Sequence, residues 1–330
     1  MKRAHALALG AALLLAGVLF VGTAPHARAL TTYVRGAPPP PQLEALGLAD
    51  LATLAARGVT LGRPENHRSP LDSGTEFSTA AHRSADGTHI ESWTLAQDEP
   101  IGEIILVPGY QASRESLLEG AAILHEAGWR VTLLDPRGVG GSGGDRTTLG
   151  WAESQDVAVV VEAAQARAQG PVVLYGFSMG GAAALRAVAT GQAQADAVIV
   201  EGCFETLRGA IAARLHHLGL PATPIADLLL FWAWVDTGIP GWSHRPVDYA
   251  AQIAAPILVV QGTEDWRSPP SAGQAVARAA PAGRYATIEG LPHQPGFAGR
   301  PVSWDRVVRG FLYETFGAPD DPAEAAPAAP

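Results

Sequence analysis

The chain has little cysteine and little lysine, and its net charge is negative. Its 330 residues include one cysteine, Cys203, and one lysine, Lys2, and the formal net charge is -9. A single cysteine excludes an intramolecular disulfide and a cysteine-based metal site, so the hydrophobic core must stabilise the fold. The acidic balance provides no basic surface for DNA or RNA, and we therefore expect no nucleic-acid partner.

Cofactor motifs are missing from the sequence as well. The ten histidines show no metal-ligand spacing. The glycine-rich run "RGVGGSGG" at residues 137–144 has neither the lysine of a P-loop nor the downstream acid of a dinucleotide site. We predict that the protein binds no metal and needs no cofactor.

The N-terminal segment has the pattern of an export signal. Two basic residues precede an uncharged run of small and aliphatic residues that reaches Pro25, and the small residue Ala29 follows. These features predict a signal peptide, residues 1–29, with cleavage near Ala29. A run of about 20 uncharged residues can also stay in place as a membrane anchor, here residues 4–25. Both alternatives predict an extracytoplasmic protein, which is secreted, periplasmic or attached to a membrane.

Composition divides the remaining chain into five parts. Residues 30–75 contain the proline-rich stretch "GAPPPPQ" and are expected to be an extension or linker. Residues 318–330 have too few apolar groups to pack, which predicts a disordered tail. Residues 76–202 and 253–317 are expected to form one α/β core, interrupted by a helical lid at residues 203–252.

Short apolar runs alternate with helical segments throughout the expected core. Two β-rich runs flank Asp86-Gly87, a pair that suits a tight hairpin turn. Helical periodicity predicts helices over 113–128, beginning at a capping serine, and over 154–170. Six further runs predict strands that helices cover on both faces: "EIILVPG", "WRVTLLD", "PVVLYG", "ADAVIVEG", "APILVVQG" and "RYATIEG". We predict an α/β fold, with a doubly wound, mostly parallel sheet of eight strands and right-handed crossovers.

The expected lid is rich in aromatic residues. We expect it to lie over the carboxyl edge of the sheet, where ligands bind in open α/β folds. Ordinary packing within the lid is the alternative for each aromatic residue. The residues that we predict to line a substrate pocket are Gln111, Phe231, Trp232, Trp234 and Trp266.

One serine lies between glycines at the end of an expected strand. The stretch "VVLYGFSMGGAAAL" places Ser178 between Gly176 and Gly180, where a β-branched strand gives way to an alanine-rich helix. Flanking glycines allow a sharp turn that exposes the hydroxyl, and the helix directs free N–H groups toward it. Ser178 is therefore the candidate nucleophile, and capping of the helix is the alternative role.

The acid and the base that a serine nucleophile requires are expected on loops after later strands. Asp265 follows the strand "ILVVQG", and His293 follows the last strand. None of the other histidines follows the final strand. The carboxylates and imidazoles that compete with Asp265 and His293 by position or type are Glu201, Glu264, His216, His217 and His244.

The chain resembles the α/β-hydrolase superfamily over roughly residues 77–316. Besides the glycine-flanked serine, "LVPGYQ" and "DPRGVGGSGG" carry the resemblance, and "TLGWAESQD" is similar to the serine-peptidase-like, membrane-associated subset. The resemblance implies that Ser178 is the nucleophile, Asp265 the orienting acid and His293 the base. It also implies an oxyanion hole made by the backbone amides of Met179 and Tyr110, with the Tyr110 hydroxyl as a further candidate donor.

These features together predict an exported serine hydrolase. It would cleave a carboxylic ester, thioester or amide of a small-molecule acyl substrate through an acyl-enzyme. A serine peptidase that acts on short peptides is the alternative within hydrolases. A binding protein that keeps the fold without turnover is the alternative from another class.

Overall fold

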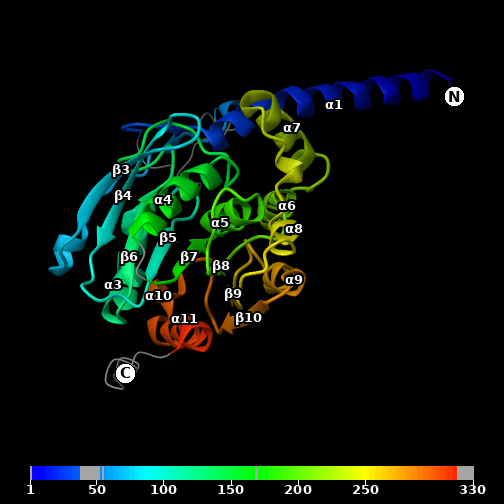
Figure 1. The fold of residues 1–330 in the computed structure, drawn as a ribbon. Coiled ribbons are helices and arrows are strands. Elements are labelled where there is room, and N and C mark those ends of the chain that lie inside the picture. Colours follow the sequence, from blue (N-terminus) through cyan, green and yellow to red (C-terminus); the bar gives the residue numbers. More distant parts are fainter. Residues whose placement is uncertain (1, 38–52, 54–55, 168–169, 318–330) are drawn as a thin grey trace.

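A mixed sheet of eight strands occupies the centre of the molecule (Figure 1). The computed structural model describes residues 2–37, 53, 56–167 and 170–317. The sheet order is β10-β9-β8-β7-β5-β6-β4-β3, and every neighbouring pair from β10 to β6 is parallel. This arrangement confirms the predicted fold class. The strands are β3 (Ser78–Arg83), β4 (His89–Leu95), β5 (Glu103–Val107), β6 (Arg130–Asp135), β7 (Val172–Phe177), β8 (Ala197–Glu201), β9 (Ile257–Gly262) and β10 (Gly283–Ile288).

The first two strands of the sheet form an antiparallel hairpin at one edge. Strand β4 pairs antiparallel with both β3 and β6. The turn closes where the amide of Ser84 donates to the carbonyl oxygen of Thr88, at 2.9 Å, and Gly87 adopts a φ of 85°. Only glycine adopts this left-handed conformation readily, so the Asp86-Gly87 pair explains the hairpin.

Two apolar clusters pack on opposite faces of the sheet. One face is covered by helices α4 (Glu153–Arg167), α5 (Met179–Ala189), α8 (Pro246–Ala250) and α9 (Pro270–Ala279). The other face is covered by the 3-10 helix η3 (Arg114–Leu117) and by helices α3 (Leu118–Glu126), α10 (Gly296–Gly299) and α11 (Pro301–Phe316). Neighbouring strand residues such as Val173 and Leu174 enter different clusters, which explains why the parallel strands are apolar without alternation.

The expected helix over 113–128 differs from prediction at its start. Ser113 does not cap it, because the Ser113 hydroxyl donates to the carbonyl oxygen of Glu65, at 3.2 Å. The chain instead forms η3 before α3 begins. The other end agrees with the prediction, since Gly128 has a φ of 88° just beyond α3.

The lid region, residues 203–252, contributes helices both to the hydrophobic core and to the layer over the carboxyl edge of the sheet. Its helices are α6 (Leu207–His217), α7 (Ile225–Thr237), the 3-10 helix η4 (Gly241–Ser243) and α8. Helix α8 packs on α5 and α9, and its Tyr249 and Ala250 are buried in the core. Helices α6 and α7 are therefore the part that lies over the carboxyl edge of the sheet (Figure 1).

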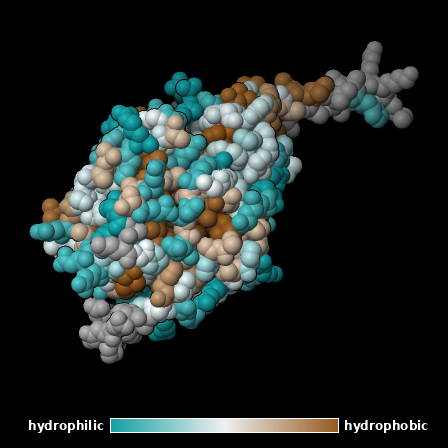
Figure 2. Space-filling model, viewed as in Figure 1, coloured by the Kyte–Doolittle hydropathy of each residue, from teal (hydrophilic) through white to brown (hydrophobic). Residues whose placement is uncertain are grey.

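The N-terminal segment forms a long helix, α1 (Lys2–Thr31), that runs along α7 (Figure 1). Hydrophobic residues lie on the exposed surface of this helix (Figure 2). After α1, strand β1 (Tyr33–Val34) pairs in parallel with β2 (Leu61–Gly62), and the 3-10 helix η2 (Pro70–Ser73) leads to the core. The predicted boundary after residue 29 thus falls inside a helix. Among the described helices, none has the length and hydropathy that crossing a membrane requires.

Two predicted segments lie largely outside the described residues. They are the proline-rich spacer, from residue 38 onward, and the tail at residues 318–330.

Candidate active site

Ser178 lies at a sharp turn between β7 and α5. Its φ of 52° and ψ of -111° form a strained backbone conformation for a residue with a side chain. The amide of Ser178 donates to the carbonyl oxygen of Glu201 on the neighbouring strand β8, at 2.7 Å. This bond, together with the turn, fixes the hydroxyl at the carboxyl edge of the sheet.

The flanking glycines are required by close backbone contacts. A Cβ atom at Gly176 would overlap the carbonyl group of Gly180, and one at Gly180 would overlap the carbonyl oxygen of Val107. Backbone atoms cannot yield as a flexible side chain can. The sequence pattern around Ser178 therefore has a steric cause, which capping of α5 would not require; indeed, Ser178 makes no side-chain cap bond.

A chain of hydrogen bonds connects Ser178, His293 and Asp265. The Ser178 Oγ lies 3.1 Å from Nε2 of His293, and Nδ1 of His293 lies 2.7 Å from Oδ2 of Asp265. With the neutral imidazole protonated at Nδ1, His293 donates to the carboxylate and accepts from the serine hydroxyl. The structure thus brings together the three residues that the sequence singled out.

Backbone and side-chain donors hold the Asp265 carboxylate in place. Oδ1 accepts from the amides of Arg267 and Ser268, each at 2.9 Å. Oδ2 accepts from Nε2 of Gln261, at 3.0 Å, as well as from His293. Only 2% of the Asp265 side chain is exposed, whereas the neighbouring Glu264 is exposed to solvent.

Glu201, the other acidic candidate, belongs to a separate buried network. Its carboxylate accepts from the Tyr175 hydroxyl at 2.6 Å, the Trp304 indole at 2.8 Å and the Gly296 amide at 2.6 Å. Burial raises the pKa of Glu201 to about 7 against the effect of these donors. Glu201 therefore ties β7 and β8 to α10 and α11.

The competing histidines lie elsewhere. His244 is fully buried, with Nδ1 3.1 Å from the Tyr249 hydroxyl and Nε2 3.0 Å from the carbonyl oxygen of Leu149. Burial lowers the pKa of His244 to about 4. His216 and His217 are exposed on α6.

Ser178, Met179 and Tyr110 line one cavity. Met179 is the first residue of α5, where a helix leaves its amides without intrahelical acceptors, and Tyr110 follows the Pro108-Gly109 turn after β5. The Tyr110 hydroxyl donates to the carbonyl oxygen of Leu30, at 2.7 Å. The idea that this hydroxyl supplies a further donor to the oxyanion is therefore wrong, because the hydroxyl is directed to α1.

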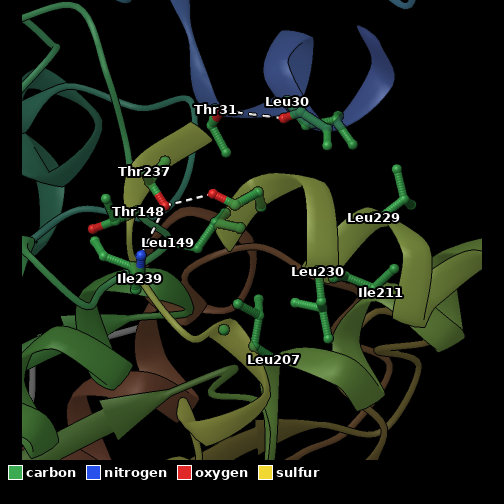
Figure 3. Close-up of a pocket in the computed structure, with 13 residues that line it drawn as sticks. Leu30, Thr31, Thr148, Leu149, Leu207, Ile211, Leu229, Leu230, Thr237 and Ile239 are labelled. Carbon is green, nitrogen blue, oxygen red and sulfur yellow. Dashed lines mark hydrogen bonds between the residues drawn. The ribbon is translucent and has the colours of Figure 1, made fainter. Parts of the chain in front are cut away.

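The rest of this cavity is mostly aliphatic. It is lined, besides those three residues, by Leu30, Leu149, Phe204, Leu207, Ala210, Ile211 and Arg214. A second apolar cavity adjoins it between α1, α6 and α7 (Figure 3), and the two share Leu30, Leu149, Leu207 and Ile211.

The predicted pocket residues line neither cavity. Helix α7 directs Leu229 and Leu230 toward the second cavity and its aromatic rings toward α1 or solvent. Phe231 and Trp232 contact Phe20 of α1, with ring centroids 5.5 and 4.9 Å apart. Trp266 stacks on His217 at a ring-centroid distance of 3.7 Å. The three remaining predicted pocket residues are exposed to solvent: Gln111, Trp234 and Trp266.

Spacing could have revealed the aliphatic lining that sequence reasoning missed. Leu207 and Ile211 are four residues apart on α6, and Leu229 and Ala233 are four apart on α7. Residues at this spacing share one face of a helix. The pattern indicates a buried face, although it does not say that the face borders a cavity.

Glu153 has a role that the sequence did not reveal. Its carboxylate accepts from the Thr147 hydroxyl at 2.7 Å and from the amides of Thr148 and Gly150, each at 2.9 Å. These bonds hold a loop in which Leu149 has a φ of 58° and lines both cavities.

A protein family and a curated relative match parts of the chain in sequence. Residues 98–233 match a protein family described as serine aminopeptidase, S33. The chain is also 27% identical over 186 residues to the uncharacterized protein YqkD of Bacillus subtilis (strain 168). That alignment covers 55% of this chain and 61% of YqkD, so the chain spans less than two thirds of this relative.

Several solved esterases share the fold. The esterase Pf2001 of Pyrococcus furiosus has a TM-score of 0.64 and 20% identity, and the match covers 76% of this chain and 96% of that one. The esterase RhEst1 of Rhodococcus sp. ECU1013 has a TM-score of 0.53 and 19% identity, over 72% and 99% of the two chains. A thermophilic esterase of Thermogutta terrifontis has a TM-score of 0.54 and 19% identity, also over 72% and 99%.

Proposed function

The chain has the α/β-hydrolase fold and matches the serine aminopeptidase family over residues 98–233, and from that premise we propose that it hydrolyses carboxylic esters through an acyl-enzyme on Ser178. The hydrogen-bond chain from Ser178 through His293 to Asp265 is the observation that carries this proposal. It supplies a nucleophile, a base within reach of its proton and a carboxylate that orients the base.

In the proposed reaction, His293 Nε2 accepts the Ser178 proton as Oγ attacks the carbonyl carbon of the ester. Asp265 stabilises the imidazolium that forms. The amides of Met179 and Tyr110 would bind the negative charge that develops on the carbonyl oxygen. His293 then gives its proton to the departing alcohol, and a water molecule releases the acid by the same steps.

The cavity at Ser178 favours esters over the aminopeptidase reading that the family description suggests. An aminopeptidase must hold the positively charged α-amino group of its substrate near the scissile bond. Among the described residues that line this cavity, Arg214 is the only charged one. A guanidinium repels an ammonium group, and the aliphatic lining suits an uncharged acyl group.

An active-site probe tests whether the protein is a serine hydrolase. We expect a fluorophosphonate to label the wild type and not Ser178→Ala. His293→Ala should reduce the labelling rate about 100-fold or more, because the serine loses its base. His216→Ala, which removes an exposed imidazole from the lid, is the matched control and should label normally.

The outcome separates the three functional classes. No labelling of the folded wild type would favour a binding protein without turnover. Labelling accompanied by faster release of p-nitroaniline from aminoacyl anilides than of p-nitrophenol from acyl esters would favour a peptidase. Labelling with the opposite preference supports the ester hydrolase.

We also propose that the protein acts outside the cytoplasm, because its first residues have the pattern of an export signal. N-terminal sequencing of the protein recovered from the cell envelope and the medium tests this proposal. A chain that begins at Leu30 indicates cleavage after Ala29, and a chain that begins at Met1 in the envelope indicates an anchor. Recovery from the cytoplasm alone would contradict export.

A further inference from the structure

The cavity between α1, α6 and α7 offers a ligand mostly apolar surface (Figure 3). Its walls are mostly aliphatic, with contributions from Leu229 and Leu230 of α7. Three threonines also line it, but each hydroxyl already donates elsewhere: Thr31 to the carbonyl of Ala27 at 3.1 Å, Thr148 to Glu153 at 2.6 Å and Thr237 to the carbonyl of Ala233 at 2.6 Å. Their methyl groups remain for contact with a ligand.

This cavity continues from the one that contains Ser178. Leu30, Leu149, Leu207 and Ile211 line both, so the two cavities adjoin at these side chains. An acyl group attached to the Ser178 Oγ would first fill the near cavity and then reach the second one as its chain lengthens.

We propose that the second cavity binds the distal part of an unbranched aliphatic acyl group, and that the N-terminal helix supplies one of its walls. The inference rests on the proposed ester hydrolysis. It assigns a substrate class to the site, and it assigns α1 a place in substrate binding, which requires that residues 1–29 stay attached to the protein as in the anchor alternative.

The end of α1 is fixed by bonds to three separate elements. The Leu30 carbonyl accepts from the Tyr110 hydroxyl at 2.7 Å, and the Thr31 carbonyl accepts from the Thr147 amide at 3.0 Å. Farther back along α1, the Phe20 carbonyl accepts from the Trp232 indole of α7 at 2.6 Å. Leu30 and Thr31 are thereby held over the cavity, as Figure 3 shows, and Ala27 also lines it.

The same segment also contacts the loop that follows β5. The Tyr33 hydroxyl accepts from the amide of Gln111, at 3.2 Å, next to Tyr110. Tyr33 is 3% exposed and packs with Leu61 and Val139. The segment from Leu30 to Tyr33 therefore connects the wall of the acyl cavity with the loop of the proposed oxyanion hole.

Filling the second cavity alone tests the assignment. Ala233 lines that cavity and not the one at Ser178, so Ala233→Phe should exclude long acyl chains and admit short ones. Each displaced methylene of a hydrophobic pocket costs about tenfold or more in kcat/KM. We expect kcat/KM for p-nitrophenyl octanoate to fall at least about tenfold in this variant, while the value for the acetate changes by less than about twofold.

Val235→Phe is the matched control. Val235 lies two residues further along α7 and is 54% exposed, and it lines neither cavity, so a ring there should leave both esters unaffected. Leu30→Ala tests the contribution of α1 in the full-length chain. It should lower kcat/KM for the octanoate more than for the acetate.

The results distinguish failure of this inference from failure of the proposed function. Equal losses on both esters in Ala233→Phe, or no loss on the octanoate, would overturn the acyl cavity while leaving ester hydrolysis intact. Equal effects of Leu30→Ala on the two esters would remove α1 from substrate binding. If the wild type hydrolyses neither ester and is not labelled by the fluorophosphonate, the proposed function itself fails.

Discussion

The hydroxyl of Tyr110 donates a hydrogen bond to the carbonyl oxygen of Leu30, at 2.7 Å, and joins the loop after β5 to the end of α1. The two residues are 80 positions apart in the chain. Since the Tyr110 amide is the proposed oxyanion donor, the bond links the position of that donor to a segment outside the sheet.

Tyr110→Phe should lower kcat with little effect on stability beyond that of one lost hydrogen bond. Such a bond contributes about 0.5–1.5 kcal/mol, so we expect kcat on p-nitrophenyl acetate to fall by up to about tenfold. Tyr285→Phe is the matched control, because its hydroxyl donates to the Pro270 carbonyl at 3.2 Å, away from Ser178. If the two variants lose stability equally and neither changes kcat, Tyr110 only stabilises the fold.

Gly180→Ala should abolish labelling of Ser178 by a fluorophosphonate. The new methyl group would overlap the backbone oxygen of Val107, so either the turn that carries Ser178 or strand β5 must move. Gly310→Ala in α11 provides the comparison, since a Cβ there meets no atom within 4 Å. Alanine is the better helix former by about 1 kcal/mol, and this variant should be at least as stable as the wild type by urea unfolding. Normal labelling of Gly180→Ala would contradict the steric argument.

The residues that form the hydrogen-bond chain could be found from sequence because each has a local signal. Glycines flank Ser178 at a change from strand to helix, while Asp265 and His293 each follow a strand. Parallel strands end at the same edge of the sheet, so chain order alone brings these loops together. What remained open was the choice among similar residues. Hydrogen-bond partners decide that choice for Glu201 and His244, whose side chains bond to other groups within the core.

The cavity could not be predicted because its residues have no chemical signal of their own. Aromatic side chains suggested a pocket at Phe231 and Trp232, yet α7 turns these rings toward Phe20. That orientation depends on α1, and the Trp232 indole bonds to a carbonyl 212 residues away in the chain. A segment interpreted only as an export signal gave no reason to expect such a contact, and the prediction that Phe231 and Trp232 line the substrate pocket was wrong for this reason.

Arg214→Gln should improve hydrolysis of substrates that carry a positive charge near the ester. Arg214 lines the cavity at Ser178, and none of the described carboxylates forms an ion pair with it. Removing its charge should raise kcat/KM for p-nitrophenyl esters of amino acids with a free α-amino group by roughly tenfold, relative to the ester of the matching fatty acid.

Arg208→Gln controls for a general change in lid charge. Arg208 lies on the same helix and pairs with Asp227 at 2.6 Å, and its side chain is 42% exposed. The Arg208→Gln variant should leave the ratio of kcat/KM for the amino-acid ester to kcat/KM for the fatty-acid ester unchanged. A ratio that is the same in the wild type and both variants would show that Arg214 does not select substrates by charge.

Glu201 and His244 should give folding stability opposite dependences on pH. The pKa of Glu201 is raised to about 7, so its contribution is fully present below about pH 4.5 and is lost as the pH rises through 7. The pKa of His244 is lowered to about 4, so its contribution is present above about pH 6.5 and is lost as the pH falls through 4. The two effects partly cancel in the wild type across this range.

Glu201→Gln should expose the effect of His244. The amide loses at least one of the three hydrogen bonds that Glu201 accepts, which lowers the melting temperature at all pH values. Because the amide does not ionise, the difference in unfolding free energy from the wild type should shrink by about 3 kcal/mol between pH 4.5 and 7. Calorimetry across this range measures it, with the exposed Glu264→Gln as control. A difference that stays constant with pH would mean that Glu201 does not change its protonation in the folded protein over this range.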